Sequence, residues 1–199
     1  RVGTFKSGGN VECRQDFALL ATLFGVIAEH EGDPRLQSSA PIMRALCYEA
    51  AEACREPSAE SFKAARDAQQ VLADLLRGTQ PAEAEPQSPQ VVEQSLLMQR
   101  METAIETNIS PSLADKRTFR RNAAEIAHEG QLLAMLARVI QHPNYDFGED
   151  EEFLSMAEDL RKASQSISEA AGNQDYEATR SATGRATQSC SACHEGYRG

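Results

Sequence analysis

The sequence of 199 residues predicts an all-α protein. Alanine, glutamate, leucine, arginine and glutamine dominate the composition, and these residues favour helix. Apolar residues also recur at helical spacing through most of the chain. No strand-rich stretch is present to supply a sheet. The core must therefore form by packing helices against one another.

The first part of the chain predicts three helices, which follow a polar lead-in at residues 1–10 that we expect to be flexible. Glycine and proline at Gly32-Asp33-Pro34 end the first helix, Ser58 is a suitable N-cap for the third, and Gly78 closes the third. The three helices are predicted over about 11–30, 38–55 and 58–77.

A proline-containing segment at residues 81–89 separates residues 1–80 from residues 90–199. It buries no apolar surface and favours extended chain, so we predict a linker between two helical parts. The second part predicts four helices, over about 90–109, 116–141 and 149–171 and from about 175 to the Cys-x-x-Cys-His motif near the C-terminus. The acidic run Glu149–Glu152 is interpreted as a first turn that complements the helix dipole, rather than as an acidic docking patch.

The last ten residues contain Cys190-Ser-Ala-Cys193-His194, the attachment pattern of c-type haem. Two cysteines three residues apart share one helix face, so each thiol can add to one haem vinyl group while the next imidazole binds iron. A thioredoxin-type motif would need a βαβ unit, and a zinc site would need two more ligands, yet the nearest other cysteine is Cys54. We therefore predict one covalent haem c.

The composition limits the partners and the location of such a protein. A net charge of −10 argues against nucleic acid as a partner and is compatible with a basic redox partner protein. No apolar run reaches membrane length. Thioether attachment of haem takes place outside the cytoplasm, so we expect a periplasmic or otherwise extracytoplasmic protein whose export signal was removed before residue 1.

The two parts resemble each other at a fixed offset, which predicts an internal duplication. Leu19–Leu23 is similar to Leu132–Leu136, and Met43 falls at the offset of Met156. The alternative is that two Ala- and Leu-rich segments align by composition. The first copy lacks the Cys-Cys-His pattern, so it is predicted to be a haemless scaffold, a homodimerisation surface or a docking module.

Three cysteines lie outside the motif. Antiparallel pairing of the first two helices would bring Cys13, at the start of one, close to Cys54, at the end of the other. We predict a disulfide between them and a buried free thiol at Cys47.

The second part resembles the cytochrome c′ class over about residues 90–199. The resemblance rests on Cys190, Cys193, His194, Tyr197 and Arg198 at the C-terminus, supported by Arg121–Ile126. It implies an antiparallel four-helix bundle that holds the haem in its core, with His194 as the proximal iron ligand and Arg198 beside the haem.

The resemblance also implies that residues 90–109 supply the distal face of the haem. Five-coordinate members carry an apolar residue there, and six-coordinate members carry a methionine ligand. Leu97, Met98 and Met101 occupy this region; Met98 is our candidate sixth ligand and Met101 the second, unless both are core methionines. The weaker candidates are His30, His128 and His142.

Electron transfer is the expected function, because a haem with two protein axial ligands cycles one electron with little reorganisation. Gas binding at an open distal side, for NO or CO, is the alternative. A peroxidase-like enzyme would need a distal acid or base, and residues 90–109 offer Glu93, Glu102 and Glu106 but no histidine. We expect no enzymatic activity, and an adaptor role for residues 1–80 is a fourth interpretation.

Overall fold

The computed structural model describes residues 1–79 and 91–197, and the regular secondary structure of these residues is entirely helical. The predicted linker at 81–89 lies outside the described residues. By its internal contacts the chain divides into two compact units, Arg1–Leu97 and Met98–Gly199. The division falls inside α5 (Gln94–Thr103), so this helix begins in the first unit and continues in the second.

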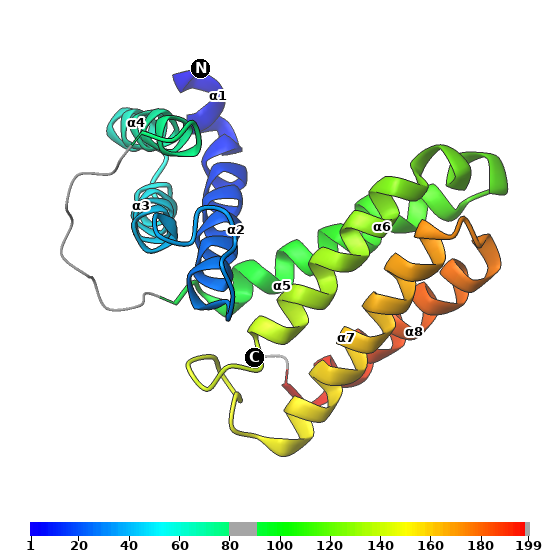
Figure 1. Cartoon of the computed structure of the whole chain (residues 1–199). Coiled ribbons are helices and arrows are strands. Elements are labelled where there is room, and N and C mark those ends of the chain that lie inside the picture. The colour runs from blue at the N-terminus through cyan, green and yellow to red at the C-terminus, as the bar shows by residue number, and fades with distance from the viewer. Residues whose placement is uncertain (80–90, 198–199) are drawn as a thin grey trace. The chain divides into compact units, whose positions relative to one another are not determined.

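Three helices make up most of the first unit: α2 (Asn10–Glu29), α3 (Ala40–Ala53) and α4 (Ala59–Leu76). Helix α2 packs along α3, and α3 also contacts α4 (Figure 1). The N-cap predicted at Ser58 is confirmed, since its Oγ accepts the Ser61 N–H at 2.9 Å. Gly78 follows α4 with a φ of +97°, a left-handed conformation that favours glycine.

The expectation of a flexible lead-in is wrong. Residues Val2–Thr4 form α1, and Phe5–Gly9 form the turn η1, which is kinked at Ser7 and at Gly8 (φ +113°) before α2 begins. The side chain of Phe5 is buried, and its ring centroid lies 5.5 Å from that of Phe62 on α4. One aromatic side chain therefore orders a stretch that its glycine and serine content alone predicts to be mobile.

The second unit contains three long helices, α6 (Lys116–Val139), α7 (Glu151–Gly172) and α8 (Tyr176–Tyr197). They lie side by side with alternating direction, α6 along α7 and α7 along α8 (Figure 1). Two short turns precede them, the π-helix η2 (Ala104–Ile109) and the 3₁₀ helix η3 (Ser110–Leu113). The fully buried side chains between these elements include Ile109, Phe119, Ile126, Leu133, Phe153 and Ile167.

The helix predicted over 90–109 is shorter than expected. Regular α-helix extends only from Gln94 to Thr103, after which the chain widens into η2 and then tightens into η3. Pro111 lacks a backbone N–H and cannot continue an α-helical ladder.

Aspartates are the N-caps of α6 and α7, the second and third of the four helices predicted for residues 90–199. Asp115 accepts the N–H groups of Arg117 and Thr118 at 2.8 and 2.9 Å, which caps α6. Asp150 accepts those of Glu152 and Phe153 at 2.9 and 3.0 Å, which caps α7. Glu151 and Glu152 lie in the first turn of α7, as predicted, whereas Glu149 precedes the cap.

Helices α6 and α7 approach each other closely at Gly130. A Cβ atom at this position would lie 2.8 Å from the Ser168 nitrogen and 3.0 Å from the Ser164 oxygen. Both atoms belong to the backbone of α7, so neither can rotate away. Glycine at position 130 is therefore a packing requirement of this helix pair.

We predict that Gly130→Ala destabilises the protein by about 1–3 kcal/mol, because overpacking against backbone outweighs the gain of up to about 1 kcal/mol in helix propensity. The urea midpoint of unfolding measures the change. Gly184→Ala is the matched control, since a Cβ on this mid-helix glycine meets nothing within 4 Å. A Gly130→Ala protein as stable as the control would contradict the close approach.

Candidate haem site

The buried side chains of α8 lie on one face of the helix, and this face continues into the C-terminal motif. Thr179, Ala182, Thr183 and Ala186 are buried at spacings of three and four residues. The same spacing continues to Cys190, Cys193 and Tyr197, so these side chains share the interior face. Both thiols are half-buried, and His194 beside them is exposed.

The two motif cysteines have raised pKa values. Burial, together with the neighbouring Cys193 and the carboxylate of Glu102, raises the pKa of Cys190 to about 11. Burial also raises the pKa of Cys193. The influence of Glu102 is informative for another reason, since it indicates that this residue of α5 lies near Cys190.

Tyr197 holds the last turn of α8 against the start of α7. Its hydroxyl donates to Asp150 Oδ1 at 2.9 Å, and its ring centroid lies 5.0 Å from Phe147 and 5.5 Å from Phe153. Burial and the hydrogen bond with Asp150 raise the pKa of Tyr197 to about 12. The sequence analysis did not predict this contact, because Tyr197 and Asp150 are far apart in the sequence.

The rotation of α5 is set by an ion pair with α6. Arg100 donates to both carboxylate oxygens of Glu129 at 2.8 and 2.9 Å, and Asn108 of η2 donates to the same carboxylate at 3.0 Å. The Glu129 side chain is only 8 % exposed. This buried carboxylate therefore holds one face of α5 and η2 against α6.

Met98 and Glu102 lie on the other side of α5. Each is two residues from Arg100, or about 200° around the helix axis, and the two are four residues apart on one face. Met98 is half-buried, while Met101 and Leu97 are buried. Glu102, the next residue along this face, is exposed. Leu97 belongs by its contacts to the first unit.

The other histidines lie elsewhere. His128 is exposed on α6, and His142 Nδ1 accepts the Asn144 N–H at 3.2 Å in the turn that follows that helix. His30 belongs to the first unit. Within residues 1–79 and 91–197, no three His, Cys, Asp or Glu side chains gather so as to hold a metal ion. Arg198, predicted to lie beside the haem, is outside the described residues.

Residues 145–198 match the family model described as Cytochrome C′. The matched segment contains α7, α8 and the attachment motif, and it supports a c-type cytochrome with covalently bound haem c. Comparisons with curated proteins and with solved structures gave no match. The duplication of the first part stays a prediction. Of the helices described, none is both long and apolar enough to cross a bilayer.

The donor set fits the haem that the Cytochrome C′ match implies. Two thiols one helical turn apart face the interior, and the adjacent imidazole forms no hydrogen bond within the part of the chain that the structure describes. Thiols can supply the thioether bonds and a neutral imidazole can bind iron.

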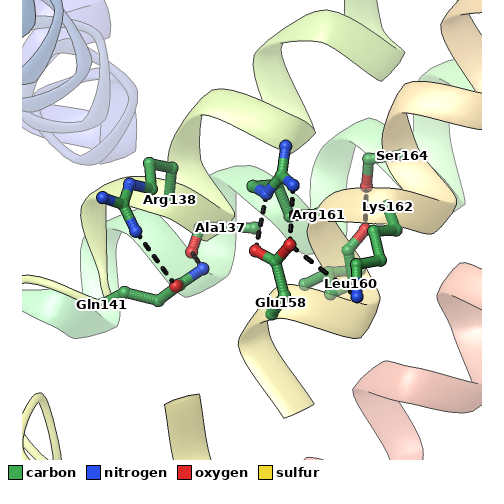
Figure 2. Close-up of polar contacts among 8 residues, drawn as sticks. All are labelled: Ala137, Arg138, Gln141, Glu158, Leu160, Arg161, Lys162 and Ser164. Atoms are coloured by element: carbon green, nitrogen blue, oxygen red, sulfur yellow. Dashed lines mark hydrogen bonds and ion pairs between the residues drawn. The ribbon is translucent and has the colours of Figure 1, made fainter. Parts of the chain in front are cut away.

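Two surface grooves in the second unit lie away from the cysteine face. One, of about 840 Å³, lies between α6 and α7, and two of its charged lining residues, Arg161 and Glu158, already pair with each other. Figure 2 shows Arg161 facing Glu158 with two donors at 2.6 Å, which lower the pKa of this carboxyl to about 2. The other, of about 450 Å³, contains Arg185, Ser189 and Ala192, a different stripe of α8. Neither groove is lined by Cys190, Cys193 or His194.

We predict that Glu129→Gln destabilises the protein by about 3 kcal/mol, since it removes the charge that compensates the partly buried Arg100. The Nη1 atom of Arg100 is already buried without a partner among the described residues. Glu125→Gln is the control, because Glu125 is exposed on the same helix. Equal urea midpoints for the two variants would contradict the role of this ion pair.

The Asp150 cap predicts a pH dependence. Backbone N–H groups, Phe153 first, and the Tyr197 hydroxyl lower the pKa of Asp150 in the folded state. A lowered pKa contributes stability that is present above the unfolded value of about 4 and is lost as the pH falls through the folded value. Asp150→Asn, which keeps a capping side chain, should therefore be less stable than the wild type at pH 7.

The thermal midpoint of the two proteins should converge as the pH is lowered below about 4. A difference that persists unchanged at low pH would show that the charge of Asp150 plays no part.

Proposed function

We propose that this chain is an electron-transfer cytochrome of the cytochrome c′ class that carries one haem c on Cys190 and Cys193, with His194 as the proximal ligand. The observation that supports it most is the interior face of α8, on which both thiols continue the buried stripe. A group attached to both sulfurs must extend from that face, toward the region where α5 brings Glu102 near Cys190.

A bound haem supplies a one-electron iron centre. The two sulfurs of the motif would hold the group, and the imidazole of His194 would bind its iron. Buried apolar side chains of α5 and η2, among them Met101 and Ile105, exclude water from the interior. In this proposal α5, α6, α7 and α8 form the antiparallel four-helix bundle that the resemblance implies, and Arg198 lies beside the group.

Met98 is the proposed sixth ligand. It lies on the face of α5 that it shares with Glu102, about 200° from the ion pair with α6, whereas Met101 is about 100° from that ion pair. A second axial ligand limits the structural change that accompanies electron transfer and closes the iron to gases.

We propose that the chain is not an enzyme and that it works outside the cytoplasm with a basic redox partner. The net charge of −10 favours such a partner. Of the three carboxylates of residues 90–109 considered as a distal acid or base, Glu93 is held by Arg14 and Arg55. No histidine is available on α5.

The first test is the mass and visible spectrum of the protein expressed with a haem-attachment system. We expect a mass that exceeds the polypeptide by one haem, and a low-spin ferrous spectrum that carbon monoxide leaves unchanged. A bare-polypeptide mass would refute haem attachment. A high-spin spectrum that shifts with carbon monoxide would replace electron transfer by gas binding.

The second test identifies the distal ligand. Met98→Leu should convert the iron to a form that binds carbon monoxide and should lower the reduction potential, because the thioether is lost. Met101→Leu changes the same atoms on the same helix and should leave both properties near those of the wild type. The reverse result would transfer the role to Met101.

A further inference from the structure

Two cysteines of the first unit lie close together in the folded chain. Cys13 lies in the first turns of α2 and Cys54 is the C-cap of α3. Burial raises the pKa of both thiols, and the interaction between their side chains partly offsets this at Cys13 and adds to it at Cys54. Both are free thiols here, so the disulfide expected between them is not formed in this structure. Cys47, two turns before Cys54, is fully buried as a free thiol.

The residues that follow these two cysteines also converge. Arg14 donates to Glu93 Oε2 at 2.7 Å, and Arg55 donates to Glu93 Oε1. Burial acts to raise the pKa of Glu93, but the hydrogen bonds and charges of Arg14 and Arg55 outweigh it and the pKa is lowered. Glu93 directly precedes α5. The two cysteines therefore lie beside the contacts of Arg14 and Arg55 with Glu93, which hold the start of this helix and which we call the clamp.

The backbone on both sides of the pair is already held in place. Asn10 Nδ2 donates to the Cys54 carbonyl oxygen at 3.1 Å in a buried position, which joins the start of α2 to the end of α3 without the cysteines. A bond between the sulfurs would therefore lock an arrangement that exists, rather than impose a new one.

We propose that Cys13 and Cys54 form a disulfide in the mature protein, and that this cross-link retains Arg14 and Arg55 on Glu93 at the start of α5. The proposal depends on the proposed function only for the oxidising compartment in which c-type haem is attached.

The reaction is an exchange with a disulfide-bonded thiol oxidoreductase. The half-buried Cys13 attacks the disulfide of that protein as a thiolate and forms a mixed disulfide, which releases one thiol of the partner. Cys54, as a thiolate, then attacks the Cys13 sulfur and releases the second. Two protons and two electrons leave the pair, and the partner disulfide becomes two thiols.

The test counts free thiols in the exported, haem-loaded protein. The protein is acid-quenched, denatured and alkylated without reductant. Haem attachment uses two of the five cysteines. A cross-link leaves one alkylatable thiol, Cys47, and without a cross-link three remain.

Digestion with trypsin and Glu-C together assigns the bond, because it separates Cys47 from Cys54. The expected product is Cys13-Arg14 joined to Ala53-Cys54-Arg55, two hydrogens lighter than the sum of its parts. Alkylated Cys13 and Cys54, or a bond from Cys13 to Cys47 or to a second chain, would overturn the proposal. The peptide that contains Cys190 and Cys193 is analysed separately, so a protein that lacks haem is distinguished from a protein that lacks the cross-link.

Hydrogen exchange tests the clamp. Dithiothreitol, which leaves thioethers intact, should speed amide exchange at the start of α5 in the wild type and in Cys47→Ser. It should have no effect in Cys13→Ser, which lacks the bond in either condition. Exchange that is insensitive to dithiothreitol in a protein shown to be cross-linked would remove the clamp from the proposal.

Discussion

The interior face of α8 is the constraint on which the rest of the site depends. Side chains three and four residues apart share a helix face, so a stripe that is buried at Thr179, Ala182 and Ala186 must continue through Cys190 and Cys193. A group bonded to both sulfurs is thereby directed toward the inside of the helical unit. Tyr197 ends the stripe, and its contacts with Asp150 and Phe153 prevent the last turn from fraying.

The orientation of α5 about its own axis is determined by an ion pair. Arg100 and Glu129 form a pair that is largely withdrawn from water, so its geometry specifies which side of α5 meets α6. The opposite side, with Met98 and Glu102, follows from helix geometry alone. In the first unit, Glu93 is held just before the same helix by two arginines. A carboxylate thus fixes α5 in each unit: Glu93 just before its start in the first unit, and Glu129 through Arg100 in the second.

Much of the secondary structure was predictable because local chemistry determines it. Ser58, Asp115 and Asp150 begin helices by accepting backbone N–H groups, a property of the residue and its next three neighbours. The lead-in and the end of α5 were mispredicted for a shared reason. The order of Phe5 depends on Phe62, far along the chain, and the widening into η2 accompanies the contact of Asn108 with α6. Neither contact leaves a local signal.

The sequence by itself determined that this protein is helical and that its last turn carries the pattern of two thiols and an imidazole, because both depend on spacing along one chain. Tertiary structure decided which side of α5 meets α6, what anchors Tyr197, and that Cys13 and Cys54 lie near each other. These depend on how helices rotate and pack, and that rotation is set by pairs of residues distant in sequence, such as Arg100 with Glu129 and Gly130 with Ser168.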